Sequence, residues 1–173
     1  ARTFGSVWSG ETIDLDALIE ETEKALEQVP VIKKIASNFD YNPGVTTMGR
    51  GYSYANAHEC ALKIQETVKI PVASFSSADY LHGPISSLHS DSRVIFLAPM
   101  GIAENAMSAT VARIREITNH IYWIGAGFPR QASETLLGVS TPLSEVAAVI
   151  SDTVPLQLFA FFLAFLPGRT PVA

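Results

Sequence analysis

The sequence predicts one α/β domain, a three-layer αβα sandwich built on a parallel sheet of about five strands. Short apolar runs alternate with longer stretches of helical period after residue 40. The run RVIFLAP at 93–99 is continuously apolar after Arg93, which suits a strand that is buried on both faces of a parallel sheet. A length of 173 residues is enough for one domain with a sizeable core.

The N-terminal part is expected to differ from the rest. Residues 11–39 have helical period, with acidic residues around an apolar stripe and Asp14 as a plausible N-cap. The stretch NPG at 42–44 marks a turn, and the strand pattern begins after it. We therefore expect residues 1–40 to form a linker and helical segment, and residues 41–173 to form the sheet domain.

The remaining elements follow in order. The patterns predict strands at 45–48, 70–75, 93–99 and 120–127, a weaker strand at 135–139, helices at 54–67 and 103–118, and a closing helical region at 142–166. We expect Asp152 to cap the last helix and Pro155 to lie in its first turn. The most apolar run, Val154–Leu166, is too short to span a bilayer, and we interpret it as a buried or interface helix.

Composition and charge exclude several classes of protein. The net charge of −5 argues against nucleic-acid binding, which needs basic surface. Cys60 is the only cysteine, which excludes an intrachain disulfide and a cysteine-based metal cluster and fits a reducing compartment. The N-terminus lacks the charged start and apolar core of a signal peptide. We therefore expect a cytoplasmic protein that has no membrane or nucleic-acid partner.

A glycine turn is the first candidate binding element. Gly49, Arg50 and Gly51 lie between a predicted strand and a predicted helix. Glycines let the backbone approach a ligand closely, and the start of the following helix offers free N–H groups to an anion. This turn and the loop after 70–75 would lie at the carboxyl ends of strands, where open α/β sheets bind ligands. The motif is neither GxGxxG nor a P-loop, so a purely structural turn is the alternative.

The second candidate is a charged helix face. Glu59, Lys63 and Glu66 are spaced so that they share one face of the helix predicted at 54–67. A solvated surface is the alternative, because exposed pairs of this kind contribute only about 0.3–0.5 kcal/mol. The rest of this helix is mostly apolar, which favours a charged face that borders a cleft.

His82 is the third candidate. It precedes Gly83 and Pro84, which force a turn, so it lies in a loop. A histidine titrates near neutral pH and suits acid/base catalysis, although a structural role is the alternative. The other histidines show no metal-ligand spacing with it, and we expect no metal site.

Taken together, these motifs resemble the sugar isomerase (SIS) domain. The stretch from GRGYSY to LHGP is similar to the second, C-terminal isomerase domain of the glucosamine-6-phosphate synthase family and its deaminase relatives. The shared pattern is a strand, GRG, a helix with E-x-A-L-K-x-x-E, a second strand and HGP. VIFLAP and DTVPLQLFAFFLA match later parts of the same domain, so the resemblance covers roughly residues 40–166.

The resemblance implies a flavodoxin-like sheet and an enzyme of aminosugar phosphates such as glucosamine 6-phosphate or fructose 6-phosphate. Glu66 would be the base that moves a proton between C1 and C2 of the open-chain sugar. Lys63 would contact sugar hydroxyls and stabilise the enediol or enolamine. His82 would assist ring opening from a neighbouring subunit. The glycine turn and Glu59 would contact substrate. No cofactor is implied, and the apolar last helix and the partner-borne histidine predict a homodimer.

The sequence also departs from the family pattern. Family members carry two such domains, and the first grips the phosphate with an S-x-S-G-x-T loop that does not occur in this sequence. The C-terminal tail that carries a further active-site lysine is not seen either. We therefore expect a lobe of the second, C-terminal type. A non-catalytic sugar-phosphate-binding module and an incomplete lobe of a two-domain enzyme are the alternatives.

Overall fold

A five-stranded parallel sheet forms the centre of the molecule in the computed structural model, which describes residues 3–4, 13–98, 100–125, 130–138 and 144–165. The strand order is β4-β3-β5-β6-β7, and every neighbouring pair is parallel. The strands are β3 (Val45–Gly49), β4 (Val72–Ser76), β5 (Arg93–Leu97), β6 (Ile121–Ile124) and β7 (Thr135–Gly138). The predicted ends at 99, 126–127 and 139 lie outside the described residues. A separate antiparallel pair joins β1 (Thr3–Phe4) to β2 (Ile13–Asp14).

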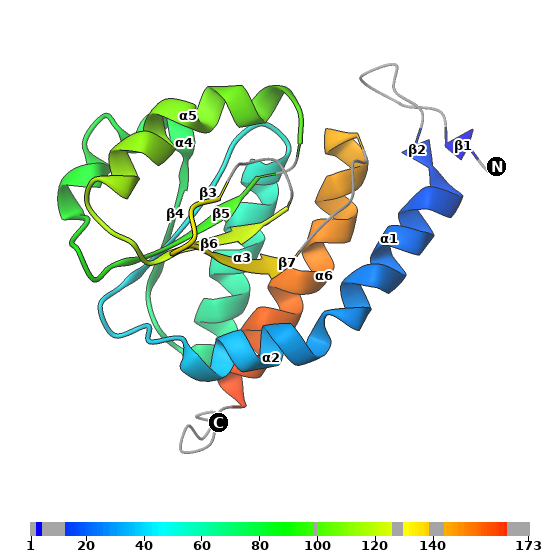
Figure 1. Ribbon diagram of the computed structural model, residues 1–173, viewed down its shortest axis with the longest axis horizontal. Coiled ribbons are helices and arrows are strands. Elements are labelled where there is room, and N and C mark those ends of the chain that lie inside the picture. The colour runs from blue at the N-terminus through cyan, green and yellow to red at the C-terminus, as the bar shows by residue number, and fades with distance from the viewer. Residues whose placement is uncertain (1–2, 5–12, 99, 126–129, 139–143, 166–173) are drawn as a thin grey trace.

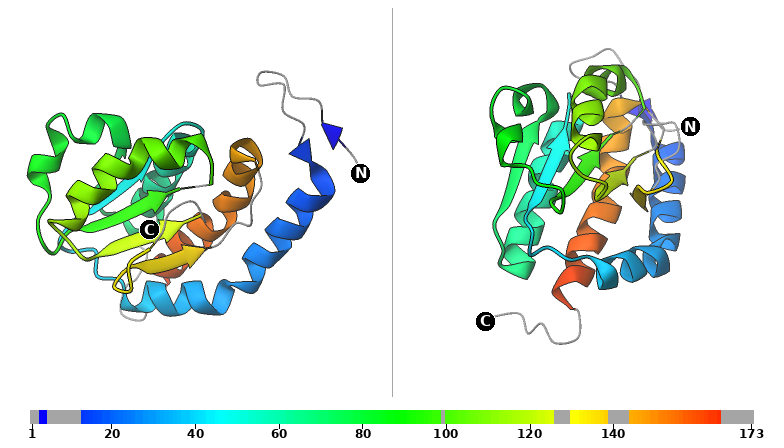
Figure 2. Two further views of the ribbon diagram at one scale, coloured as in Figure 1. Left: turned by 45° about the horizontal axis from the view of Figure 1, so that its top comes forward. Right: turned by 60° about the vertical axis from the view of Figure 1, so that its left-hand side comes forward.

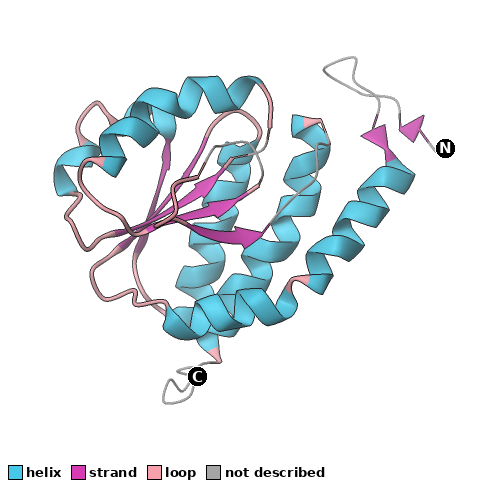
Figure 3. Cartoon of the chain, in the orientation of Figure 1, coloured by secondary structure: helices cyan, strands magenta, loops and turns pink. Residues whose placement is uncertain are grey.

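Helices cover both faces of this sheet, as Figures 1 and 2 show. One face carries α3 (Ser53–Val68) and α6 (Glu145–Ala164), and α1 (Leu15–Glu27) and α2 (Val29–Asn38) pack against α6. The other face carries α5 (Ile102–Arg115), the short α4 (Ser77–Tyr80) and a 3₁₀ turn, η1 (Pro84–Ser87). Figure 3 shows the helix–sheet–helix layering. The predicted three-layer αβα sandwich is confirmed.

Two apolar clusters lie on opposite sides of the sheet. All five residues of β5 are buried, as the apolar run that follows Arg93 predicts. Ile95 and Leu97 face the cluster under α3 and α6, and Phe96 faces the cluster under α5, where its ring stacks on Trp123. Cys60 belongs to the first cluster, and burial raises the pKa of its thiol to about 12. This cysteine is therefore an apolar core group.

The predicted N-terminal helical segment consists of two helices, α1 and α2. Asp14 caps α1, because its carboxylate accepts hydrogen bonds from the backbone N–H groups of Asp16 and Ala17, at 3.0 and 3.2 Å. The chain bends at Gln28, and Pro30 lies in the first turn of α2. Proline is tolerated in a first turn, where it has no intrahelical hydrogen bond to lose.

The start of the last helix differs from the prediction. α6 begins at Glu145 with Ser144 as its N-cap, so Asp152 is not a cap and Pro155 lies in the helix interior. Both residues are buried within α6, where packing against α1, α2 and α3 outweighs the roughly 3 kcal/mol cost of an interior proline. By length and composition alone this helix could cross a membrane, but half of its apolar window is buried within the fold.

Candidate functional site

The predicted charged face of α3 is present. Lys63 Nζ lies 2.7 Å from Glu66 Oε2 and 4.0 Å from Glu59 Oε1. Glu59 also accepts a hydrogen bond of 3.1 Å from Gln157 of α6. The helical spacing therefore places an ammonium group between two carboxylates, and α6 holds one end of this row.

This charged row is neither buried nor fully solvated. The side chains of Glu59 and Lys63 are 30% and 32% exposed, and that of Glu66 is 52% exposed. The hydrogen bond from Lys63 to Glu66 raises the pKa of Lys63, and both carboxylates add to this shift. Lys63 is therefore a fixed cation beside a carboxylate that solvent or a ligand can reach.

A hollow of about 580 Å³ adjoins the row, between α3 and the edge strand β4. Glu59 lines it together with His58 and Gln65 of the same helix and Ser74 of β4. The His58 ring packs edge-on against Tyr54, with 4.4 Å between the ring centroids. The predicted cleft therefore exists beside Glu59, while Lys63 and Glu66 lie on the neighbouring part of the helix surface.

The glycine turn and Glu66 lie at opposite ends of α3. The turn follows β3 at the carboxyl edge of the sheet, whereas Glu66 is in the last turn of α3, before β4 begins. Thirteen helical steps from Ser53 to Glu66 correspond to about 20 Å. The structure thus does not bring the two sets of predicted site residues together.

The residues of the glycine turn have structural roles. A Cβ at Gly49 would overlap the backbone carbonyl of Ser53, so this glycine lets α3 start close to the sheet. Arg50 donates a hydrogen bond of 3.2 Å to the hydroxyl of Ser76 at the end of β4. Gly51 has a φ of 59°, in the left-handed region that favours glycine. The structural alternative for this turn is therefore well supported.

His82 lies on the other side of the sheet from Glu66. It is exposed in the turn between α4 and η1, where its backbone N–H donates to the carbonyl of Asp79 at 3.1 Å. Tyr80 and Leu88 on either side of it belong to the cluster under α5. Within one chain, His82 therefore does not reach the face of α3.

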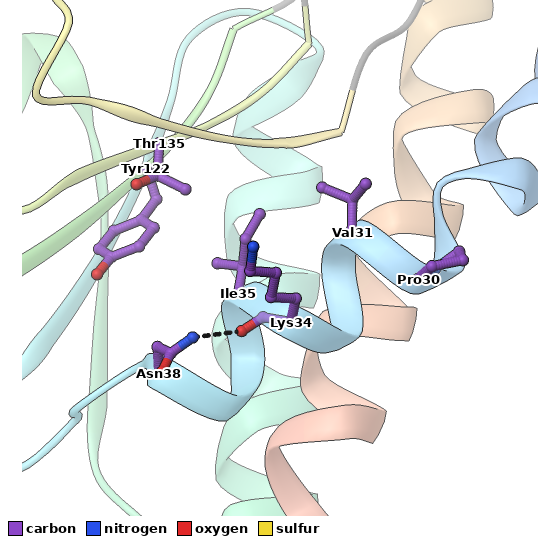
Figure 4. Close-up of a pocket in the computed structure, with 7 residues that line it drawn as sticks. All are labelled: Pro30, Val31, Lys34, Ile35, Asn38, Tyr122 and Thr135. Atoms are coloured by element: carbon purple, nitrogen blue, oxygen red, sulfur yellow. Dashed lines mark hydrogen bonds between the residues drawn. The ribbon is translucent and has the colours of Figure 1, made fainter.

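A second hollow, of about 620 Å³, lies between α2 and the strands β6 and β7 (Figure 4). Its lining is mainly apolar, and its charged side chain, Lys34, has no carboxylate among the lining residues. Asn38 donates to the backbone carbonyl of Lys34 at 2.9 Å. This hollow lacks the paired groups that proton transfer needs.

Two contributors to the α3 site were not predicted. Neither Gln157 nor His58 is among the site residues that the sequence predicts. His58 and Gln65 are seven residues apart, so helical periodicity places them on one stripe of α3, beside the stripe of Glu59, and the sequence contains a signal for them. The contact of Gln157 joins residues 98 positions apart, and no local pattern reports it.

The family model of the SIS domain matches residues 44–124, which include strands β3 to β6. The glutamine–fructose-6-phosphate aminotransferase (isomerizing) of Pectobacterium atrosepticum is 30% identical over 158 residues, which cover 89% of this chain and 26% of that protein. The chain thus spans only about a quarter of the length of this curated relative.

Solved structures show the same fold. The C-terminal domain of glucosamine-fructose-6-phosphate aminotransferase from Francisella tularensis superposes with a TM-score of 0.81 at 19% identity, covering 92% of this chain and 45% of that one. Tagatose-6-phosphate ketose/aldose isomerase from Escherichia coli superposes with a TM-score of 0.76 at 18% identity, covering 90% and 44%. These structures share the α/β fold of this chain, in which residues 44–124 match the SIS domain model.

Proposed function

We propose that this chain is the part of a phosphosugar isomerase or deaminase that carries the proton-transfer groups. It acts on an aminosugar phosphate such as glucosamine 6-phosphate or on fructose 6-phosphate, by moving a proton between C1 and C2. The single observation that carries the proposal is the contact of 2.7 Å between Lys63 and Glu66 on a half-open helix face. The names of the relatives, which act on hexose 6-phosphates, support the substrate class.

The chemistry follows from the two groups. Removal of a proton from a carbon next to a carbonyl needs a positioned base. The carboxylate of Glu66 can be this base, because its side chain is exposed enough to contact a bound sugar. The negative charge that develops on the enediol or enolamine oxygen needs a fixed positive group, and Lys63 supplies it. Glu59, held by Gln157, is placed to contact sugar hydroxyls at the neighbouring hollow.

The proposed site is completed by a second copy of the domain. His82 faces away from its own Glu66, so ring opening by this histidine requires that it come from another chain. α6 exposes Ile150 and Phe161, Phe165 is exposed directly after it, and Leu62 of α3 is also exposed. Apolar side chains on helices that carry the site are suited to an interface. We therefore propose a homodimer, with the substrate bound where the two copies meet.

A non-catalytic sugar-phosphate-binding module is the second candidate. It is favoured by the 52% exposure of Glu66, because a general base whose pKa is tuned for catalysis is usually more enclosed. In such a module Lys63 and Glu59 would bind the sugar while Glu66 only holds Lys63. The cytoplasmic location and the expectation that neither metal nor cofactor takes part stay predictions.

Deuterium exchange tests the proposal most directly. The chain is incubated in D₂O with fructose 6-phosphate or glucosamine 6-phosphate, and NMR follows deuterium entering at C1 or C2, together with ammonia release. We expect exchange in the wild type and a loss of about 10²–10⁴-fold in Glu66→Gln, the usual contribution of a general base. Glu23→Gln, an exposed substitution on α1, is the control and should exchange like the wild type.

The two candidates give different results in this assay. Unchanged exchange in Glu66→Gln removes the proposed base. Binding of the sugar phosphate without exchange in the wild type, with equal affinity in Glu66→Gln, supports the binding module.

A further inference from the structure

Glu145 lies at the carboxyl edge of the sheet, and its side chain reaches from the start of α6 to the start of α5. Its Oε1 accepts a hydrogen bond of 2.7 Å from the backbone N–H of Ala103. This N–H is one of the donors that the first turn of a helix leaves without an intrahelical partner. The N-cap of α5 is Gly101, which has no side chain to fill that place. The carboxylate of a distant residue therefore occupies it.

Two glycines provide the space for this carboxylate. Gly101 has a φ of 141°, and a Cβ there would overlap Glu145 Oε1. A Cβ at Gly51 would lie 3.8 Å from Glu145 Oε2 and 3.7 Å from the Cβ of Ala103. The carboxylate is thus seated between the turn after β3 and the turn after β5.

The position of the Glu145 carboxylate has the electrostatics of an anion site. The start of a helix carries a partial positive charge and free N–H groups, which in parallel α/β sheets hold phosphate at the carboxyl edge. Arg50, in the same glycine turn as Gly51, points its guanidinium to Ser76 instead of to a free anion site. Here the anion is already supplied by the chain itself.

We propose that Glu145 excludes phosphate from the start of α5. As the resident anion of the carboxyl edge, it blocks binding of a phosphate group at the start of α5. A phosphorylated ligand bound at the α3 face must then have its phosphate held by groups other than the start of α5. The exclusion itself is a property of the edge, and only this last consequence rests on the proposed function.

Inorganic phosphate is the probe for the test. Backbone amide NMR of the ¹⁵N-labelled chain follows the Ala103 and Gly101 signals during a phosphate titration of the wild type and of Glu145→Ala. We expect no saturable shift in the wild type and a saturable shift in Glu145→Ala at millimolar phosphate. The control is Glu104→Ala, which removes the same charge from the first turn of α5 and should behave like the wild type.

A second variant keeps the test decisive if Glu145→Ala does not fold. Glu145→Gln keeps the side-chain length and an oxygen acceptor but removes the charge, and we expect a weaker saturable shift. An Ala103 signal that responds equally in wild type and variant overturns the proposal. So does a folded variant without any response. Absence of sugar exchange would contradict the proposed function alone, because the phosphate titration does not depend on turnover.

Discussion

The carboxyl edge of the sheet and the exposed face of α3 differ in which groups form hydrogen bonds with their polar side chains. At the edge, Arg50 donates to Ser76 and Glu145 accepts from Ala103, so side chains of the fold itself fill the position where many parallel α/β proteins bind ligands. On the α3 face, Lys63 pairs with both Glu66 and Glu59, and solvent reaches all three side chains. The polar groups at the edge are satisfied within the fold, whereas those on the α3 face remain accessible to a ligand. The fold alone therefore does not locate the site in this chain.

The largest effect that we expect is a loss of sugar turnover when His82 is replaced. In His82→Ala we expect sugar turnover to fall about 100-fold, the lower range for an acid/base group, with little change in stability because the side chain is exposed. Mixing this variant with Glu66→Gln should restore about a quarter of the wild-type rate, since half of randomly formed dimers are mixed and each has one intact site.

The control for this experiment is to measure each variant alone at the same total concentration. If the mixture is no more active than the two separate variants, the site is not shared between copies. The proposal of a dimeric site then fails.

The next effect concerns the closed edge. In Gly49→Ala, the new methyl group would overlap the Ser53 carbonyl, and we expect a loss of about 3 kcal/mol in the free energy of unfolding. This corresponds to a Tm lower by about 10 °C for a chain of this size. The control is Gly44→Ala, where φ is 99° but no atom lies within 4 Å, and the cost should be about 1 kcal/mol. Equal losses in both would show that Gly49 is not packed closely.

A buried ion pair provides a reference for the open one. Glu134 accepts hydrogen bonds from Arg115 and from the Trp123 indole, and its side chain is 1% exposed. Burial alone would raise the pKa of Glu134, but the hydrogen bonds from Arg115, the Gln131 amide and Trp123 bring it below its usual value of 4.5. The pair therefore stabilises the fold fully above pH 4.5, and this contribution is lost as the pH falls through the lowered pKa.

We expect Glu134→Gln to lower the free energy of unfolding by about 2 kcal/mol at pH 7, because hydrogen bonds to a buried charge are weakened. Urea titrations at pH 7 and pH 3 should show a smaller difference between variant and wild type at the lower pH. The control is Glu116→Gln, which removes the exposed partner of Arg113 and should cost less than 0.5 kcal/mol. If the free energies of unfolding of variant and wild type differ as much at pH 3 as at pH 7, the stability of the fold does not depend on the charge of Glu134.

The smallest expected effect is on stability at the open face. In Lys63→Met we expect the free energy of unfolding to change by less than about 0.5 kcal/mol, because exposed ion pairs contribute little. Urea denaturation measures it, with Glu20→Gln on α1, another helical partner of an exposed lysine, as the control. A loss above 2 kcal/mol would mean that the charged row is part of the packing and not a free functional surface.

The strands and the α3 row could be predicted because both depend on short-range patterns. β5 is a continuous apolar run after Arg93, and Glu59 and Glu66 are each one helical turn from Lys63. The start of α6 could not be predicted from the sequence. Pro155 suggested a first turn, and only packing against three other helices makes an interior proline acceptable. Contacts such as Glu145 with Ala103 join residues 42 positions apart, so only the folded chain reveals them.

α6 has a consequence for the temperature at which the protein is handled. Half of its apolar window is covered within the fold, and Phe161 near its end and Phe165 directly after it are exposed. Association through such surface is driven mainly by entropy near 25 °C and weakens on cooling. Pairing through α6 should therefore loosen in the cold room and tighten on warming, opposite to an association held by ion pairs.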